Sequence, residues 1–211
     1  MSDHHKHILT EVADYYSKKL VAHGESAQGV DWNGEQSQML RFRQLCRIIN
    51  GPGHFSINEI GCGYGALCDF LAQEYPSYRY TGIDISEKMI EAGRRRHSKN
   101  DALRFILSSE PDQVADYGVA SGIFNIRLQN SYEEWRSYVE CNLNVLNETS
   151  RLGFSFNCLT SYSDAEHMQP HLFYPDPASL FELCKRRYSR NVALLHDYDL
   201  YEFTILVRKV C

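Results

Sequence analysis

The sequence lacks any apolar run of the roughly 18 residues that a membrane-spanning helix needs. Its first residues, from Met1 to His7, have neither the charge pattern nor the apolar stretch of a signal peptide. The seven cysteines are scattered and form no C-x-x-C pair, which is the spacing typical of metal and redox sites. We therefore expect a cytoplasmic protein with reduced thiols and no membrane partner.

An excess of positive charge is also missing, because the formal net charge is −5. Nucleic-acid partners usually require a basic face, so this balance argues against one. The basic clusters at 94–96 and 185–187 lie in helical patterns and are interpreted as solvated faces. His4, His5 and His7 lie at a terminus without a rigid frame, so we expect no metal site. Nothing in the sequence indicates an oligomeric state.

The length of 211 residues fits one domain with a substantial core. Apolar residues recur at helical spacing in two segments, about 8–20 and 33–49, and Gly51-Pro52-Gly53 ends the second. We predict that residues 1–50 form a helical cap and that residues 54–211 form an α/β core. The whole chain, 1–211, is thus expected to be a single domain.

From Ile57 onward, short β-prone runs alternate with helical patterns, which predicts a doubly wound, mostly parallel sheet with helices on both faces. The last two strands are separated by only residues 197–200, too few for a parallel crossover, so we expect an antiparallel C-terminal strand. The seven predicted strands are 57–60, 80–85, 103–107, 117–124, 152–158, 192–196 and 201–207.

Three alternating glycines, Gly61, Gly63 and Gly65, follow the first predicted strand and precede a helical pattern. Glycine permits a sharp turn and a close approach of the backbone to a ligand, and Asp84 ends the next strand. This pattern predicts a nucleotide-type cofactor site. Because Ala66 also completes G-x-G-x-x-A, the motif alone fits both S-adenosylmethionine and a nicotinamide dinucleotide.

The segments Glu59–Gly65 and Tyr80–Ile90 resemble motifs I and II of the class I S-adenosylmethionine-dependent methyltransferases. This resemblance implies that Glu59 lies near the methionine end of the cofactor, that the glycines pass beneath it and that Asp84 binds its ribose. A sulfonium cation also favours aromatic faces and nearby acidic groups. Our candidate cofactor residues are Glu59, Gly61, Cys62, Gly63, Tyr64, Gly65, Asp84, Ile85, Met89, Ser108, Ser121, Trp32 and Arg41, the last as a partner of the cofactor carboxylate.

Two departures from the family pattern narrow the expected chemistry. Ser108-Ser109-Glu110 stands where an acidic residue often contacts the adenine. Ser121-Gly122-Ile123-Phe124-Asn125 is unlike the Asn-Pro-Pro-Tyr motif of adenine or glutamine amino-group methylation. The acidic cluster of magnesium-dependent catechol methyltransferases is also missing, so these subclasses are disfavoured.

We expect methyl transfer to an oxygen or nitrogen atom of a small-molecule acceptor. The family architecture implies an acceptor pocket near the N-terminal helices and the loops after strands four and five. Candidate acceptor residues are Tyr15, Tyr16, Asn125, Arg127 and Tyr174, and candidate general bases are His196 and His171. Each of these side chains could instead be structural. Three alternatives stay open: a tRNA, rRNA or protein methyltransferase, an NAD-dependent oxidoreductase, and a binding protein without chemistry.

Overall fold

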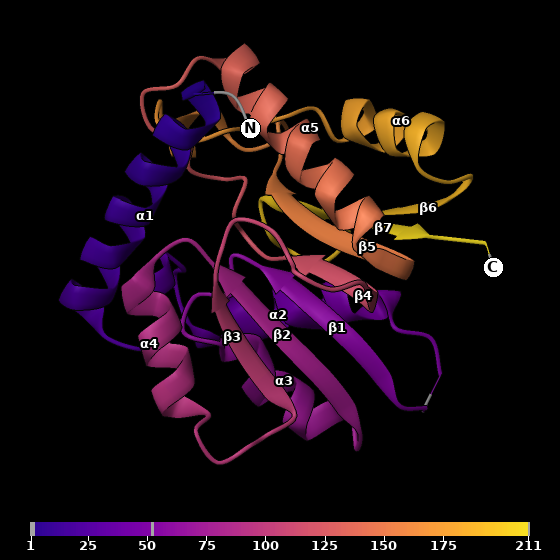
Figure 1. Cartoon of the computed structure of the whole chain (residues 1–211). Coiled ribbons are helices and arrows are strands. Elements are labelled where there is room, and N and C mark those ends of the chain that lie inside the picture. Colours follow the sequence, from indigo (N-terminus) through magenta and orange to yellow (C-terminus); the bar gives the residue numbers. More distant parts are fainter. Residues whose placement is uncertain (1–2, 52, 211) are drawn as a thin grey trace.

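A seven-stranded sheet forms the centre of the molecule in the computed structural model, which describes residues 3–51 and 53–210 (Figure 1). The strands are β1 (Phe55–Ile60), β2 (Tyr78–Asp84), β3 (Leu103–Leu107), β4 (Ala115–Ala120), β5 (Ser150–Leu159), β6 (Asn191–Leu195) and β7 (Glu202–Arg208). The α-helices are α1 (Asp3–His23), α2 (Glu35–Leu45), α3 (Ala66–Glu74), α4 (Glu87–Arg96), α5 (Tyr132–Glu148) and α6 (Pro177–Arg187). Short 3-10 helices η1 (Gln28–Val30), η2 (Cys46–Ile48) and η3 (Ala165–His167) complete the list.

The strand order is β3-β2-β1-β4-β5-β7-β6. Strands β1 to β5 pair in parallel, whereas β7 pairs antiparallel with both β5 and β6. The predicted fold class and the reversed C-terminal strand are therefore confirmed. In this order β1 and β4 are neighbours whose connections leave in opposite directions, which is the switch point where open α/β sheets bind ligands.

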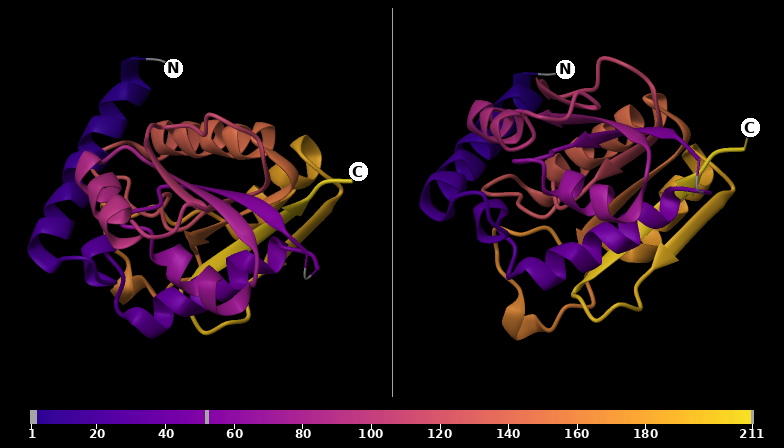
Figure 2. Two further views of the ribbon diagram at one scale, coloured as in Figure 1. Left: turned by 60° about the horizontal axis from the view of Figure 1, so that its bottom comes forward. Right: turned by 90° about the horizontal axis from the view of Figure 1, so that it is seen from below.

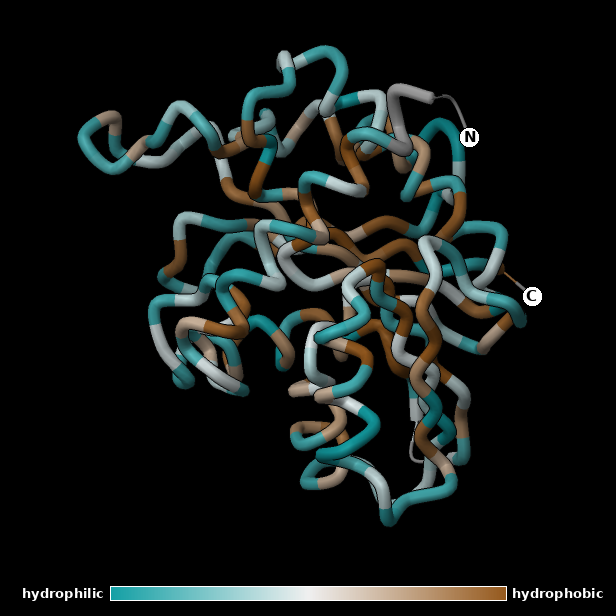
Figure 3. Tube along the Cα trace, turned by 60° about the vertical axis from the view of Figure 1, so that its left-hand side comes forward, coloured by the Kyte–Doolittle hydropathy of each residue, from teal (hydrophilic) through white to brown (hydrophobic). Residues whose placement is uncertain are grey.

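Helices cover both faces of the sheet (Figure 2). One apolar core lies under α5, α6 and the first half of α1, and the other lies under α2, α3 and α4. Figure 3 shows the hydrophobic segments gathered along the strands and the hydrophilic ones in the outer loops. Within the described residues, no helix combines the length and the apolar character that crossing a membrane requires.

Two elements end four residues earlier than the sequence pattern suggests. The fourth strand was expected to continue to Phe124, but β4 ends at Ala120, because Gly122 adopts a φ of 75° and turns the chain over the sheet edge. The second helix was expected to reach Ile49, but α2 ends at Leu45 and continues as the 3-10 helix η2. Both changes occur where the chain leaves one layer for the next, and apolar periodicity does not mark such points.

Candidate active site

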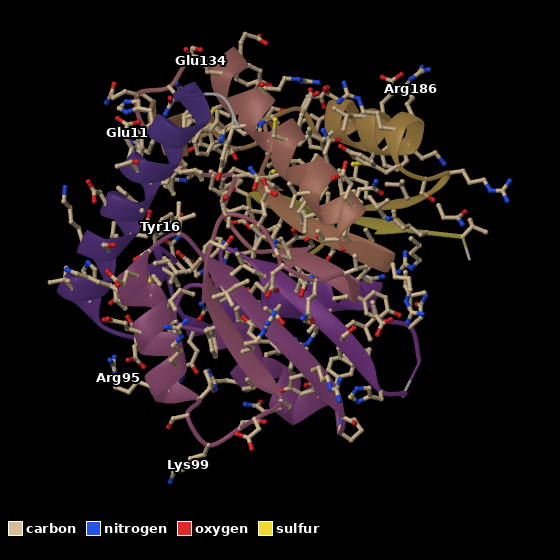
Figure 4. All side chains as sticks on the ribbon, in the orientation of Figure 1. Glu11, Tyr16, Arg95, Lys99, Glu134 and Arg186 are labelled. Carbon is tan, nitrogen blue, oxygen red and sulfur yellow. The ribbon has the colours of Figure 1, made fainter. Side chains whose placement is uncertain are left out.

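A cavity of about 870 Å³, counted with its open mouth, lies at the carboxyl ends of β1, β2 and β4. The turns after these three strands form its floor, while α1 and α5 supply walls from outside the sheet. Tyr16, which Figure 4 labels, lies on the side of α1 that faces the strands. The location is the one expected for a ligand site in this fold class.

The glycine turn between β1 and α3 is held in the left-handed region. Gly61, Gly63 and Gly65 have φ values of 72°, 55° and 83°, which side chains rarely tolerate. At Gly61 an added Cβ would also lie 2.1 Å from a methyl carbon of Ile123. The N–H groups of Gly61 and Cys62 donate to the carbonyl of Ile83, at 2.7 and 3.0 Å. The turn is therefore fixed to β2 with its backbone exposed to the cavity.

Asp84 links the glycine turn to the start of α4. Its carboxylate accepts hydrogen bonds from the N–H of Gly63 at 2.9 Å and from the N–H of Ser86 at 2.8 Å. Burial raises the pKa of Asp84, and the hydrogen bonds from these N–H groups oppose the rise. A carboxylate has about four acceptor positions, so Asp84 retains capacity for ligand hydroxyls.

Glu59 is the second acidic group that lines the cavity. It is almost completely buried, and the hydroxyl of Tyr80 donates to it at 2.5 Å. Burial raises the pKa of Glu59 to about 8, even though the bond from Tyr80 lowers it, and the charge of Asp84 adds to the rise. With its pKa at about 8, Glu59 is largely protonated at neutral pH, so it offers the cavity a hydrogen-bonding group and adds little negative charge.

Aromatic and apolar side chains form most of the remaining wall. Burial raises the pKa of the Tyr16 and Tyr138 hydroxyls, that of Tyr138 to about 12, so both stay protonated at neutral pH. Burial also holds the pKa of the Cys62 thiol well above its ordinary value, which makes it an inert wall group. Faces of Tyr16, Trp32 and Tyr138 could contact a cation by cation–π attraction.

Most of the residues predicted to bind a cofactor meet at this cavity. The wall includes Glu59, Gly61, Cys62, Gly63, Tyr64, Asp84, Ile85, Met89, Ser108, Ser121 and Trp32. Gly65 caps α3 just outside it, and its carbonyl contacts the ring of His97 at 3.0 Å. Arg41 lies behind Trp32, with its guanidinium carbon 3.9 Å from the centre of the Trp32 ring, and is paired with Glu202.

Of the predicted acceptor residues, the cavity wall includes Tyr16. The hydroxyl of Tyr15 donates to Asp31 at 2.8 Å, and the amide oxygen of Asn125 accepts from the N–H of Leu159. Arg127 donates to three backbone carbonyls, and the Tyr174 hydroxyl accepts from the N–H of Gln169. These four side chains thus have structural partners outside the cavity.

The two candidate bases also lie away from the wall. His171 is exposed, and its carbonyl accepts from the N–H groups of Arg127 and Leu128. The exposed His196 packs its ring near Tyr162 and Phe203, with ring centres 5.9 and 6.3 Å apart.

Of the N-terminal histidines, the side chains of His4 and His5 lie outside the described residues. Among the residues described, no group of three His, Cys, Asp or Glu side chains could hold a metal ion.

Tyr16 of α1 was predicted near the acceptor, but the other wall residues of α1 and α5 were not predicted. Leu9 and Val12 of α1 had a signal, because they belong to its apolar stripe, but such a stripe is equally typical of core packing. Tyr138 and Asn142 of α5 carry no local signal that separates them from other helix residues. The other wall residues without a predicted role are Ala13, Val30, Gln38, Phe42, Ile60, Ala66, Ile83, Ser109, Gly122 and Ile123.

The geometry agrees with comparisons to known proteins. Residues 57–116 match the family model described as a methyltransferase domain. The Mycobacterium tuberculosis protein Rv1506c, which is named as a methyltransferase, is 56% identical over 163 residues, which cover 77% of this chain and 98% of that protein. The chain belongs to the class I S-adenosylmethionine-dependent methyltransferases. The resemblance carried by the glycine motif and Asp84 is thereby confirmed, and the oxidoreductase alternative is set aside.

Solved structures confirm the fold of this methyltransferase. The N-methyltransferase NodS from Bradyrhizobium japonicum, solved with S-adenosylhomocysteine, matches with a TM-score of 0.65 and 15% identity, covering 94% of this chain and 98% of that one. The DhpI complex with S-adenosylhomocysteine matches with a TM-score of 0.63 and 16% identity, and the match covers 96% of this chain and 97% of that one. At such low identity these structures speak for the fold alone. A Yersinia pestis ribosomal RNA small subunit methyltransferase C is 30% identical over 86 residues, 41% of this chain and 23% of that protein.

Proposed function

We propose that this protein transfers a methyl group from S-adenosylmethionine to an oxygen or nitrogen atom of a small-molecule acceptor. The observation that carries the proposal is the cavity in which the glycine turn is hydrogen-bonded to Asp84. S-adenosylmethionine supplies an electrophilic methyl group on a sulfonium centre. The protein's part is to bind, orient and desolvate the reactants, which can contribute several kcal/mol.

Features of the cavity fit this cofactor. The left-handed glycine turn leaves backbone exposed where a side chain would block it, and Asp84 has free acceptor positions for ribose hydroxyls. Among the described residues, three buried polar side-chain atoms have no hydrogen-bond partner: the hydroxyls of Ser121 and Ser150 and Nη1 of Arg41. Of these three residues, Ser121 lines the cavity. A buried polar atom without a partner is costly, and the charged tail of an amino acid in the cavity would give the Ser121 hydroxyl a partner. We therefore keep Ser121 as a residue for the methionine end, with Ile85 and Met89 beside the adenine. Arg41 lies behind Trp32, outside the cavity wall, so it is kept at that end only through its contact with Trp32.

The part of the cavity wall that is not assigned to the cofactor supports a small acceptor. Leu9, Val12 and Ile123 make this part of the cavity apolar, and Tyr138 and Asn142 offer a few hydrogen-bonding groups. Small-molecule sites typically combine an apolar lining with a few polar groups in this way. We also keep the proposal that residues 1–50 are a cap on the core 54–211 within one domain, because α1 supplies part of the wall.

A general base is needed only when the methyl acceptor is an alcohol or a protonated amine. Glu59 faces the cavity, and its pKa of about 8 lets it exchange a proton near neutral pH. His171 and His196 would serve only an acceptor that extends beyond the cavity. A neutral amine, which carries its own lone pair, needs none of these groups.

An RNA or protein acceptor is the alternative within the same chemistry, and the partial match to a ribosomal RNA methyltransferase keeps it open. The two basic clusters give it little support. Arg95 and Arg96 pair with Glu25, and Arg94 donates to the carbonyl of Phe105. In the other cluster Arg186 pairs with Glu182 and Arg187 with Glu140, while Lys185 donates to the carbonyl of Arg190.

Calorimetric titration with S-adenosylhomocysteine and, in parallel, with NAD tests the cofactor. We expect binding of the first alone, and binding of NAD alone would overturn the proposal. Labelled S-adenosylmethionine is then incubated with the protein and separate pools of small molecules, total RNA and protein. We expect label in the small-molecule pool, whereas label in RNA with salt-sensitive binding would favour the alternative.

A cytoplasmic location is proposed as well, in keeping with the five free buried cysteines Cys46, Cys62, Cys68, Cys158 and Cys184.

A further inference from the structure

Glu202, the first residue of β7, is a buried carboxylate close to the cavity but not in its wall. It is 2% exposed. Nε of Arg41 donates to both of its oxygens at 2.9 Å, and Nη2 of Arg41 donates to Oε1 at 2.6 Å. The two residues are 161 positions apart, so this pair joins α2 to the reversed strand.

A second connection leads from the same carboxylate to the turn after β4. The amide nitrogen of Asn157, in β5, donates to Oε2 of Glu202 at 2.5 Å. The amide oxygen of Asn157 accepts from the N–H of Gly122 at 2.8 Å. Asn157 is completely buried, so its amide orientation is fixed by these two partners.

Both connections end on the same wall residue, Trp32. The guanidinium of Arg41 lies 3.9 Å from the centre of the Trp32 ring. On the other side, Gly122 leaves room for the ring, since an added Cβ would lie 2.3 Å from a Trp32 ring carbon. Trp32 is therefore held between Arg41 and Gly122, and both Trp32 and Gly122 line the cavity.

We propose that Glu202 is a positioning residue of the active site, which through Arg41 and Asn157 fixes Trp32 and the Gly122 backbone at one end of the cavity. We name Glu202, Arg41 and Asn157 the Glu202 network. The inference rests on the proposed function, because it assigns Trp32 and Gly122 to the cofactor and acceptor space. Ser121, whose hydroxyl is unpartnered, is the chain neighbour of Gly122 and is placed by the same hydrogen bond.

Stability alone is a poor reason for such a network. Buried ion pairs are weak stabilisers, because desolvation of both charges offsets their attraction, and apolar replacements are often as stable. By contrast, a planar guanidinium that is hydrogen-bonded to a carboxylate has a fixed orientation, and an aromatic ring can stack on it. The Glu202 network thus has the properties of a device that sets geometry.

Arg41→Lys and Glu202→Gln test the proposal in the full-length protein. Lysine keeps the charge opposite Glu202 but removes the planar group that contacts Trp32. Glutamine keeps the shape of Glu202 but removes the charge. Ser155→Ala is the matched control, because the buried Ser155 hydroxyl lies in the same strand as Asn157 and donates to the carbonyl of Leu45 at 3.0 Å, outside the network.

For each variant we measure the dissociation constant for S-adenosylhomocysteine by calorimetry and the thermal midpoint. We also measure acrylamide quenching of Trp32 in a Trp135→Phe background, which leaves Trp32 as the single tryptophan of the two. We expect Arg41→Lys and Glu202→Gln to weaken binding about tenfold or more and to expose Trp32 to quencher. Ser155→Ala lowers the midpoint and leaves binding and quenching as in the parent protein.

The proposal is overturned if Arg41→Lys leaves both affinity and Trp32 quenching unchanged, or if all three variants lose affinity in proportion to their loss of thermal stability. Should Glu202→Gln fail to fold, Arg41→Lys decides. If the parent protein does not bind S-adenosylhomocysteine at all, the proposed function fails, and Trp32 quenching still judges the Glu202 network without any ligand.

Discussion

The backbone N–H of Gly63 donates a hydrogen bond of 2.9 Å to Oδ2 of Asp84. The turn after β1 is thereby fastened to the end of β2 by the carboxylate that is expected to bind the cofactor ribose. The other oxygen of Asp84 accepts from the N–H of Ser86, the N-cap residue of α4, so one side chain orders both the turn and the next helix. The site is largely preformed.

Asp84→Asn is expected to weaken S-adenosylhomocysteine binding by about 1.5–3 kcal/mol, the usual worth of hydrogen bonds to a charged group. The asparagine side chain has one acceptor oxygen in place of two. Its NH2 group would face the N–H of Gly63 or Ser86 and cannot accept a hydrogen bond from it. Calorimetric titration measures the change. Asp101→Asn, an exposed carboxylate in the turn before β3, should bind like the parent protein. Equal affinities for all three proteins would contradict the role of Asp84.

Gly61→Ala should destabilise the protein by about 1–3 kcal/mol, the cost of backbone strain and overpacking. The φ of Gly61 is 72°, and the new Cβ would meet Ile123 at 2.1 Å. Urea unfolding gives the free energy. Gly53→Ala is the control, because Gly53 has nothing within 4 Å of an added Cβ. Adding Ile123→Ala should recover part of the loss, and no recovery would mean that backbone strain alone causes it.

The stability of the protein should depend on the ionisation of Glu59. Its pKa is about 8 in the folded protein and near its ordinary value of 4.5 in the unfolded chain. The unfolded chain therefore loses this proton first, and the contribution of Glu59 to stability falls as the pH rises from about 4.5 to 8. In Glu59→Gln, which keeps an acceptor for Tyr80, this slope is removed.

Urea unfolding of both proteins at pH 5 and pH 8 measures the effect of Glu59. The variant should gain stability relative to the parent protein between the two values, by an amount on the order of a few kcal/mol. A difference in stability that does not change with pH would mean that Glu59 titrates normally.

Arg127→Ala separates a structural role from the predicted acceptor-binding role. Arg127 donates to the carbonyls of Leu172, Asn130 and Pro170 and so joins the turn after β4 to the loop after β5. We expect a loss of about 2–3 kcal/mol in unfolding free energy with unchanged S-adenosylhomocysteine affinity. Arg104→Ala, which breaks an exposed pair with Asp112, should cost less than about 1 kcal/mol. Unchanged stability of Arg127→Ala together with impaired methyl transfer would favour the acceptor role.

The cofactor end of the site could be predicted from sequence because its signals are local. Gly61, Gly63 and Gly65 are two positions apart, and Asp84 ends the next strand, so a strand-turn-helix pattern and one acidic residue identify the place. The reversed last strand was equally predictable, since the short connection 197–200 excludes a parallel crossover.

The rest of the site depends on long-range packing. Leu9 and Tyr138 reach the cavity from helices whose apolar periodicity looks the same whether it faces a core or a ligand. The sequence shows Glu202 only as one acidic residue at the start of a strand, and its pairing with Arg41 is set by the order β5-β7-β6. Arg127 and His171 were placed near the acceptor because they follow the right strands, yet strand order fixes the loop and not where its side chains point.

The most direct test is a crystal structure of the protein grown with S-adenosylhomocysteine. We predict the ribose hydroxyls on Asp84, the adenine between Ile85 and Met89, and the amino-acid tail at Ser121 beside Trp32. Ligand bound elsewhere on the molecule, or a filled cavity in which the ribose does not meet Asp84, would contradict this prediction.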